Sequence, residues 1–481
     1  MMYWFSSASE RSAAGEGRTG DEELRGGEGT MAGRVRNGNR GERDGKVLQG
    51  DTPPPWSRPC RPRDGGGHAR GWPGIDQGIG PGAGRDRAWD PGVAAAVDPV
   101  THSLAGASLS AAGLRRATPL ATATLVLGAN APDVDILSQL WGPWTALAWR
   151  RGLTHGIPAL LLLPLLVTGV ILAWDRWVRR AEWRKGRSLA TGEPRDPLPP
   201  ARPASVLGLA ALGVWTHSPL DWINNYGMRW FLPFNGRWSY GDAVFILDPW
   251  LWLLLGGAVF VHHSHTRWSA AAWGLLAGAM TLLILLAPGI PTLSRVLWLM
   301  GLAGWIVIRL RRAPDPDSSG GRWVARTSLA LAALYILVMV GQDGVQQRVV
   351  LAAAEREGLD VEEVMVAPVP ANPFAGQVIA VTSGAYHPGE LHWLRRPVVR
   401  FHALPLPRPS DSDPRIVAAL EDRDVQAYLV WSRFPLFQME EEGEVWRVRL
   451  LDARYVGRGD GALSGPTLTV PKGPQPGEAP H

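Results

Sequence analysis

Long apolar runs are the feature that most constrains how this chain can fold. Residues 157–174 and 268–287 contain no charged side chain, and at about 1.5 Å per residue such runs approach or reach the length that crosses about 30 Å of hydrocarbon. Of the 24 tryptophans, 16 lie between Trp141 and Trp305, often near the ends of apolar runs, where aromatic belts form at membrane interfaces. These features exclude a simple soluble enzyme.

The alternation of apolar segments and polar turns after Asp98 predicts eight helices. The first two are too short to cross a bilayer, so we interpret them as a hairpin packed against the others. The fold class is therefore mainly α, a polytopic helical membrane protein with a small C-terminal α+β domain. The expected helices cover about residues 99–114, 117–131, 153–176, 204–223, 244–263, 268–288, 291–310 and 324–342.

The overall composition, with 46% hydrophobic residues, averages over unlike regions. A length of 481 residues suggests about three structural units. We divide the chain into an N-terminal extension at 1–96, a helical membrane domain at 97–343, an α+β domain at 344–465 and a disordered tail at 466–481.

The first 96 residues hold 21 of the 57 glycines and 14 of the 49 basic residues, with almost no apolar run. Such a segment cannot bury enough surface to offset its chain entropy, and it lacks the pattern of a signal peptide. It is either a disordered tail or sequence translated from upstream of the true start. We favour the second interpretation, because organised sequence begins abruptly at Val97, a possible initiator. The single cysteine, Cys60, lies in this segment, so a disulfide framework is excluded.

Basic residues in the loops predict the orientation of the helices. Eight lysines and arginines follow the third helix, between residues 176 and 202, and Arg311, Arg312 and Arg322 follow the seventh. Both loops are expected on the cytoplasmic side of a membrane that the protein spans several times. The loop at 224–242 and the segment after Gly341 are then expected on the extracytoplasmic side.

Ionisable residues gather where apolar helices start or end, and such residues are costly to desolvate without a partner or an ion. Because the chain alternates up and down, these starts and ends all fall at one face. The face is predicted to lie at the extracytoplasmic membrane boundary. The residues are His102, Asp133, Asp135, His155, His217, Asp221 and Asp248.

The spacing of these residues suits metal binding. His217 and Asp221 are four apart and project from one side of a helix, and an extended turn after Pro132 would direct Asp133 and Asp135 to the same side. Mixed imidazole and carboxylate ligands favour Zn²⁺, with Mn²⁺ or Fe²⁺ as alternatives. Such an ion can lower the pKa of a bound water and polarise an ester oxygen.

Each residue also has a simpler interpretation. A histidine at a helix start can be a cap, the Asp133 and Asp135 pair a solvated turn, and the pair on the fourth helix a hydrogen bond between helices. Asp248 precedes Pro249 and can cap its helix. The adjacent Arg150 and Arg151 can clamp a phosphate or anchor the chain at the membrane surface. We interpret His262, His263 and His265 as a solvated loop on the opposite face.

Five stretches of the chain resemble a known family, the bacterial inner-membrane-associated metal-dependent hydrolases called YdjM-like or LexA-binding. The stretches fall in the order and spacing of that family, and together they span residues 98–250. They are DPVTHSLAG at 98–106, ANAPDVD at 129–135, RRGLTHG at 150–156, THSPLDWINNYG at 216–227 and FILDPW at 245–250.

The resemblance implies a helical fold similar to that of zinc-dependent phospholipase C and single-strand nucleases, with metal held by histidine and aspartate. It implies hydrolase chemistry without naming a substrate. One position departs from the pattern: family members commonly carry histidine where this chain has Arg150, which suggests fewer ions or an arginine that contacts substrate. The implied ligands are His102, Asp133, His155, His217 and Asp221, with Asp135 close behind.

Residues 345–481 change character, with a helix expected at 345–357 and alternating apolar and polar residues after it. The resulting α+β domain would face the metal site, where it could present substrate or only stabilise the membrane part. We expect disorder after Pro466. The expected strands lie at about 363–369, 377–382, 398–403, 426–431 and 445–451.

The sequence therefore predicts a membrane-embedded metallohydrolase that cleaves a phosphoester or other ester in a lipid or lipid-linked substrate, with no nucleic-acid partner. The alternative is a non-catalytic membrane protein in which a His/Asp metal site supports the C-terminal domain. Transport is disfavoured, because transport predicts ionisable residues near the bilayer midplane. The residues expected beside the reacting ester are Asp135, Arg150, Arg151 and Asp248.

Overall fold

The computed structural model describes residues 91–185, 198–287, 289–311, 319–410, 412–456 and 464–472. Within these residues the chain is mainly α-helical with small β sheets at its C-terminal end, which confirms the predicted fold class. Residues 1–90 of the expected N-terminal extension and residues 473–481 of the expected tail lie outside the described residues.

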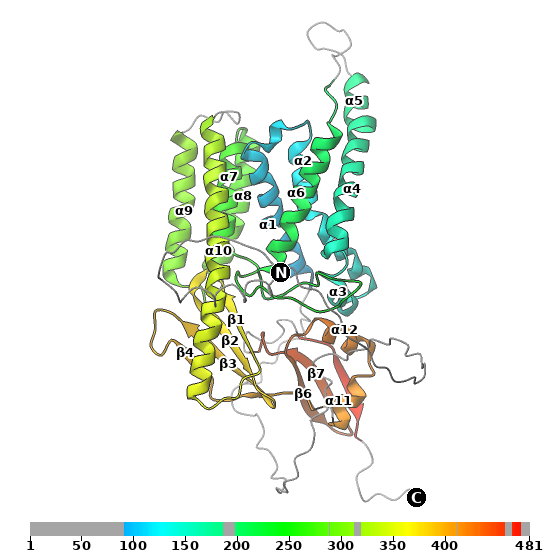
Figure 1. Cartoon of the computed structure of the whole chain (residues 1–481), viewed down its shortest axis with the longest axis vertical. Helices are drawn as coiled ribbons and strands as arrows, with labels where there is room; N and C mark the ends of the chain where they lie inside the picture. Colours follow the sequence, from blue (N-terminus) through cyan, green and yellow to red (C-terminus); the bar gives the residue numbers. More distant parts are fainter. Residues whose placement is uncertain are drawn as a thin grey trace, which may run out of the picture. The chain divides into compact units, whose positions relative to one another are not determined.

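The helices of the membrane part lie side by side (Figure 1). Each predicted apolar segment is helical, and α4 continues through a short π-helical stretch at Asp175–Arg179 into α5. The helices are α1 (Pro91–Ala111), α2 (Ala121–Asn130), α4 (Ile157–Trp174), α5 (Arg180–Lys185), α6 (Pro203–Trp222), α7 (Pro249–His263), α8 (Arg267–Leu286), α9 (Thr292–Arg311) and α10 (Ser319–Arg356).

Four of these helices are long and apolar enough to cross a membrane: Ile157–Arg179, Arg267–Leu286, Thr292–Arg311 and Ser319–Arg356. Most of their apolar side chains are exposed, as expected for surfaces that contact lipid. By contrast, α6 and α7 bury many of their side chains between the other helices. The chain is therefore a membrane protein, and His217 and Asp221, discussed below, lie on the inner helix α6.

Helix α10 is longer than predicted. Its 38 residues correspond to about 57 Å, well beyond the thickness of a hydrocarbon core. The predicted helices at 324–342 and 345–357 are one continuous helix, because Gly341 and Gly344 weaken a helix without ending it. The C-terminal part of α10 packs against the first β sheet and so joins the membrane part to the C-terminal region.

Two glycines bring α1, α2 and α6 into close contact. A Cβ atom on Gly106 of α1 would lie 2.8 Å from the carbonyl oxygen of Leu125 in α2, and one on Gly213 of α6 would lie 2.7 Å from the same atom. Larger residues would push these helices apart. His102 lies one turn before Gly106, and His217 lies one turn after Gly213, so this packing brings the two histidines together at the end of α2.

The segment between α2 and α4 differs from the prediction. Instead of an extended turn, it forms the 3-10 helix η3 (Ala131–Trp141) and the short helix α3 (Pro143–Trp149). Pro132 occupies the first turn of η3, where its missing N–H group costs nothing. Asp133 and Asp135 therefore lie on a 3-10 helix, and their side chains leave it in different directions.

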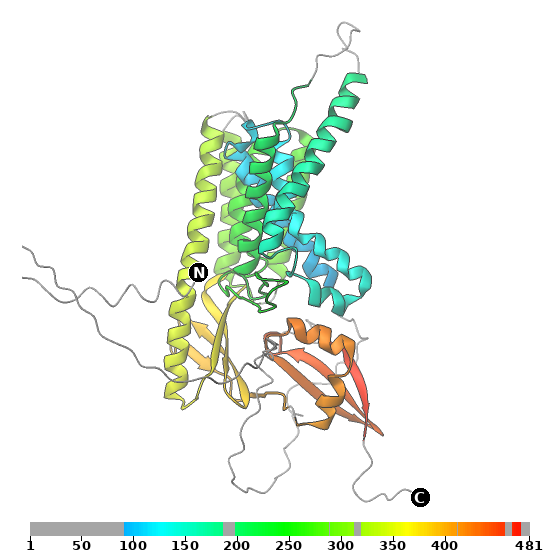
Figure 2. The same ribbon diagram turned by 45° about the vertical axis from the view of Figure 1, so that its right-hand side comes forward.

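Two antiparallel β sheets follow α10, and Figure 2 shows them as separate bodies beyond the same end of the helices. The first has the order β1-β2-β3-β4, with β5 paired to β3, and the second has the order β6-β7-β8. The strands are β1 (Glu363–Val369), β2 (Asn372–Val381), β3 (Ala385–His392), β4 (Val399–Phe401), β5 (Leu406–Pro407), β6 (Pro435–Glu442), β7 (Val445–Asp452) and β8 (Thr467–Pro471).

Helices α11 (Pro414–Ala419) and α12 (Arg423–Trp431) accompany the second sheet. The strand predicted at 426–431 was wrong, because Asp422 caps a helix there and Val425, Tyr428 and Trp431 form its buried face. Strand β8 also extends the domain beyond residue 465, since Val470 packs against Val448 of β7.

The C-terminal domain contacts the loop that follows α6. Helix α12 packs against α3, Trp238 donates a hydrogen bond to the Val430 carbonyl, and Arg433 forms an ion pair with Asp242 at 2.7 Å. Arg454 reaches from the end of β7 to the carbonyl oxygen of Asn225 at 2.8 Å. These contacts hold residues 225, 238 and 242, which follow the end of α6.

The buried pair of Asp452 and Arg454 predicts how the stability of this domain depends on pH. Burial alone would raise the pKa of Asp452, but the Arg454 guanidinium lowers it below its usual value. A carboxyl whose pKa is lower in the folded state stabilises the fold above its unfolded pKa, and this contribution is lost as the pH falls through the folded pKa. We expect hydrogen exchange in β7, corrected for intrinsic rates, to report lower stability as the pH falls below about 4. Stability that rises over this range would contradict the prediction.

Candidate metal centre

Four of the predicted ligands come together at one end of the helices. Asp133 comes from η3, His155 from the turn before α4, and His217 and Asp221 from the last two turns of α6. All four are buried, and one ligand atom from each lies within 4.8 Å of the others. The group can hold a metal ion.

The ring nitrogens of two histidines face each other across this group. Nε2 of His155 lies 3.1 Å from Nε2 of His217, and Oδ2 of Asp221 lies 3.1 Å from the first and 3.4 Å from the second. Oδ1 of Asp133 lies at 3.8 Å and 3.9 Å from the same two nitrogens. Four potential ligand atoms thus surround one small space.

The other ring nitrogen of each histidine faces an acceptor. Nδ1 of His217 lies 2.6 Å from the Ala129 carbonyl oxygen, which requires a proton on that nitrogen. Nδ1 of His155 lies 3.0 Å from Oγ1 of Thr154 and 3.4 Å from Oδ2 of Asp135. Protons on both Nδ1 atoms leave the Nε2 lone pairs directed at each other and at Asp221. These lone pairs and the Asp221 carboxylate repel one another, and a cation between them would remove the repulsion. Hydrogen-bond partners at the Nδ1 nitrogen are typical of histidines that bind metal through Nε2.

Asp135 differs from Asp133 in position. Each carboxylate lies beside a different nitrogen of the His155 ring. Asp133 is beside Nε2, and Asp135 is beside Nδ1. Oδ2 of Asp135 also accepts a hydrogen bond from the Arg151 backbone at 2.8 Å. This placement favours an orienting role for Asp135 rather than the ligand role expected from the sequence.

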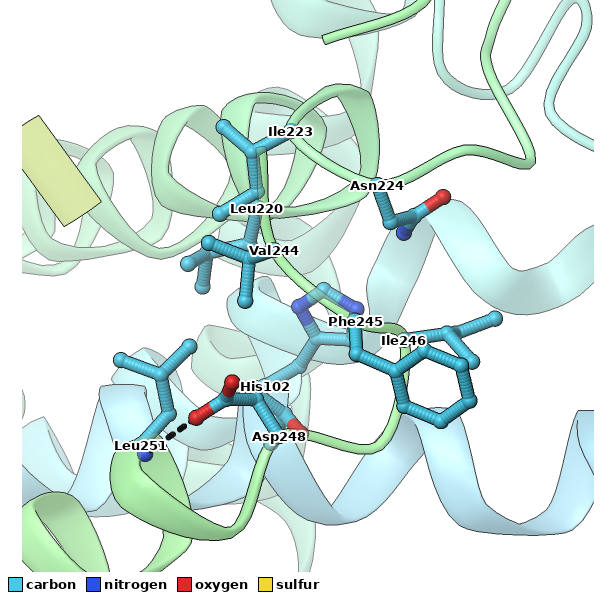
Figure 3. Close-up of a pocket in the computed structure, with 10 residues that line it drawn as sticks. His102, Leu220, Ile223, Asn224, Val244, Phe245, Ile246, Asp248 and Leu251 are labelled. Carbon is cyan, nitrogen blue, oxygen red and sulfur yellow. Dashed lines mark hydrogen bonds between the residues drawn. The ribbon is translucent and has the colours of Figure 1, made fainter. Parts of the chain in front are cut away.

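His102 lies at the edge of the group. Its Nε2 is 3.2 Å from Oδ1 of Asp221, and its ring stacks on His217 with centroids 3.8 Å apart. It also lines a cavity of about 20 Å³ (Figure 3), which is enough for one water molecule. Nδ1 of His102 has no hydrogen-bond partner among the described residues.

Asp248 lines the same cavity, and Figure 3 shows its hydrogen bond with Leu251. Both of its carboxylate oxygens accept hydrogen bonds from neighbouring groups. Oδ1 accepts from the backbone of Trp250 and Leu251 at the start of α7. Oδ2 accepts from the Tyr335 hydroxyl of α10 at 2.8 Å. Asp248 therefore caps α7 and ties it to α10.

Replacing Asp248 with alanine tests this role. We expect the loss of the cap and of the acceptor for the Tyr335 hydroxyl to cost about 2–4 kcal/mol of stability and to leave the bound metal unchanged. Thr266→Ala is the matched control, because Thr266 caps α8 and is not among the residues of the metal group. Thermal unfolding and metal content are measured on both. Loss of metal in Asp248→Ala alone would place Asp248 in the site.

The two arginines lie inside the cluster rather than at the surface. Nε of Arg151 is 3.0 Å from Oδ2 of Asp221, and its NH1 group donates to Oδ1 of Asn224 at 2.8 Å. NH2 of Arg150 is 3.5 Å from Oδ1 of Asp133, and its Nε is 3.8 Å from Oδ1 of Asp135. Burial alone would lower the pKa of Arg150, but Asp135 and Asp133 raise it. Both guanidinium groups are therefore positive charges held beside the ligands.

Two further residues of the cluster were not predicted as site residues. Asn224 accepts the Arg151 hydrogen bond. The ring of Tyr226 lies beneath the Arg151 guanidinium at 4.6 Å and beside the Trp431 ring at 5.4 Å, and burial raises the pKa of its hydroxyl. Both residues fall within the stretch THSPLDWINNYG, which is the signal that could have identified them.

The interpretation of the second histidine cluster as a solvated loop was wrong for His262. Helix α7 extends to His263 and buries His262, while His265 is exposed. In the part of the chain that the structure describes, these histidines do not form a second group of metal ligands.

Comparison with known proteins agrees with the sequence motifs. The family model of the YdjM inner membrane protein matches residues 97–290, which include every residue of the cluster. No curated protein and no solved structure matches the chain. Residues 97–290, with their buried His/Asp group at the helix ends, are thus similar to the YdjM inner membrane protein family.

Proposed function

We propose that this protein is a metal-dependent hydrolase that cleaves a phosphoester or other ester in a lipid or lipid-linked substrate. One observation carries the proposal: His155, His217 and Asp221 direct Nε2, Nε2 and Oδ2 at one another within 3.4 Å. Burying such an arrangement is costly without a cation or proton between the atoms. Hydrolysis by a metal-activated water is the chemistry that a His/Asp site of this kind supports.

The proposed ligands are Asp133, His155, His217 and Asp221. Mixed imidazole and carboxylate donors favour Zn²⁺ over Mg²⁺ or Ca²⁺. When bound, a divalent cation would acidify a water molecule and polarise an ester oxygen. We assign orienting roles to the residues around the ligands: His102 fixes Asp221 through Oδ1, and Asp135 fixes the ring of His155 through Nδ1.

Arg150 and Arg151 are the proposed anion-binding residues. A guanidinium group matches the oxygens of a phosphate or carboxylate in charge and geometry. Arg150 is the stronger candidate, because its distances of 3.5 Å and 3.8 Å to Asp133 and Asp135 are those of loose ion pairs. A substrate anion can therefore compete for Arg150, whereas Arg151 is held close to Asp221 at 3.0 Å.

The proposed substrate class rests on location. The cluster lies at the ends of helices in a membrane protein, which is where the ester groups of lipids are found. We further propose that this end, and the C-terminal domain beside it, lie on the extracytoplasmic side of the inner membrane, because the basic loops after residues 175 and 310 favour the cytoplasm.

A specific observation favours the second candidate, a structural site without catalysis. The carboxylates of Asp133, Asp135 and Asp221 face the two buried guanidinium groups of Arg150 and Arg151. Such a network can neutralise itself and hold η3, α4 and α6 together, with or without an ion. In this case the site would stabilise the surface of the membrane part against which the C-terminal domain packs.

The experiment that separates the two compares wild type, His217→Ala and Arg150→Met in lipid nanodiscs. The substrates are bis(p-nitrophenyl) phosphate and phosphatidylglycerol. If the protein is a hydrolase, the wild type should cleave at least one of the two esters. His217→Ala should then lose both metal and activity, whereas Arg150→Met should keep the metal but lose activity. His262→Ala, a buried histidine outside the group, is the control that keeps both. Metal binding without cleavage of either ester would favour the structural site.

Asp135→Asn tests the orienting role of this carboxylate. We expect metal affinity to fall by about 10–100-fold, because the uncharged amide holds the Nδ1 proton of His155 less strongly. Competition with a fluorescent zinc chelator measures the change. Thr154→Val removes the other acceptor near the same nitrogen and should have a smaller effect. Unchanged affinity in Asp135→Asn would contradict the role.

A further inference from the structure

Helix η3 has one face that is wholly apolar and exposed. A 3-10 helix has about three residues per turn, so residues three apart lie on the same face. Val134, Leu137 and Leu140 form one such row, and they are 46%, 56% and 80% exposed. In the neighbouring row, Pro132, Asp135 and Ser138 face the protein instead. The helix is therefore amphipathic with the period of a 3-10 helix.

The apolar surface continues from η3 onto a membrane-spanning helix. Trp141 at the end of η3, Trp149 at the end of α3 and Leu153 in the next turn are all exposed. Ile157 begins α4, whose exposed residues Leu161, Leu162, Leu165 and Leu166 lie on a candidate membrane span. Because η3 packs against α4, a membrane around α4 reaches the level of η3.

We infer that η3 is an interfacial helix, with its row of Val134, Leu137 and Leu140 inserted in the surface of the bilayer. Tryptophans such as Trp141 and Trp149 favour the level of the lipid headgroups, and an amphipathic helix beside a membrane span lies in the plane of the interface. The occupant of this face is lipid, since the face continues the lipid-contacting surface of α4.

The position of η3 matters for the site because Asp133 directly precedes the first residue of the row. The carboxylate faces the metal group while Val134 faces the bilayer. A headgroup ester in that leaflet would thus lie beside the site and could enter from the side, without leaving the membrane. This last step rests on the proposed function, whereas the insertion of η3 does not.

Site-directed spin labelling in nanodiscs of phosphatidylethanolamine and phosphatidylglycerol tests the insertion. The only cysteine is removed as Cys60→Ser, and a nitroxide is attached at Leu140→Cys, Leu165→Cys or Leu394→Cys. Leu394, in the first sheet region, is 79% exposed and matches Leu140 at 80%, while Leu165 reports a membrane span. The ratio of collision rates with oxygen and with a water-soluble nickel complex reports depth in the bilayer.

We expect the ratio at Leu140 to shift towards that at Leu165 and away from that at Leu394. A ratio at Leu140 equal to that at Leu394 would overturn the inference, because η3 would then face water. Protection of Leu140 from both reagents would also overturn it, because another protein or a second copy of this chain would then cover the row.

Leu137→Asn combined with Leu140→Asn separates the two proposals. The variant should keep its metal and its hydrolysis of bis(p-nitrophenyl) phosphate, but lose most hydrolysis of phosphatidylglycerol in the bilayer. If the wild type hydrolyses neither ester, the proposed function fails while the labelling result still decides the position of η3.

Discussion

Replacing Arg454 with methionine is expected to destabilise the C-terminal domain by about 3 kcal/mol, near the lower limit for breaking a buried ion pair. Arg454 and Asp452 are fully buried, with Nε and Oδ1 2.8 Å apart. Four other donors remain on the carboxylate and moderate the cost: the Ser432 hydroxyl and the backbone N–H groups of residues 433, 434 and 454. Hydrogen exchange of β7 amides in the full chain measures the loss.

The same variant should also loosen the loop after α6, because Arg454 donates a hydrogen bond to the Asn225 carbonyl. Arg415→Met is the matched control. Arg415 pairs with Asp413 at the same spacing of two residues, but the two side chains are 34% and 20% exposed, so its loss should cost no more than about 1 kcal/mol. Equal effects of the two substitutions would contradict the account of the domain contact.

The second large effect is expected for Asp221→Ala. This change removes a proposed ligand and the carboxylate that faces the buried Arg151 guanidinium at 3.0 Å. Leaving that charge uncompensated should cost about 3–5 kcal/mol, and the bound metal should be lost. Thermal unfolding with and without added Zn²⁺ measures both, because the wild type should be stabilised by the ion and the variant should not.

Asp175→Ala is the control for Asp221→Ala. Asp175 is also buried and paired with arginines, Arg179 and Arg180, but at the other end of α4. Its removal should destabilise the protein by a smaller amount, because Arg179 and Arg180 are 20% and 30% exposed, and the stabilisation by Zn²⁺ should persist. If Asp221→Ala kept the zinc response, Asp221 would not be a ligand.

The sequence predicted the membrane part of the fold well, for a physical reason. Spanning helices require long apolar runs, and these are visible in the sequence without knowledge of packing. Ionisable residues at the helix ends then identified the His/Asp residues of the cluster, the up-and-down alternation of the helices placed them at one end, and the family motifs contain the same residues. His217 and Asp221 share a helix face because they are four residues apart.

Other features depend on contacts that a linear pattern does not contain. Residues 426–431 form a helix because Asp422 caps them and α3 covers their apolar face, although their composition suits a strand. The separate roles of Asp133 and Asp135 follow from the 3-10 helix, which turns their side chains towards opposite ends of His155. The inward position of Arg150 and Arg151 depends on carboxylates far away in the sequence.

The central claim is that the buried His/Asp group holds a divalent metal ion. Elemental analysis by mass spectrometry of protein purified without chelators tests it most directly, on wild type, His155→Ala, His217→Ala and His262→Ala. We predict at least one equivalent of metal, principally zinc, in wild type and His262→Ala, and little in the other two. A wild type that contains no metal, even after incubation with Zn²⁺, or metal that remains in both ligand variants, would contradict the claim.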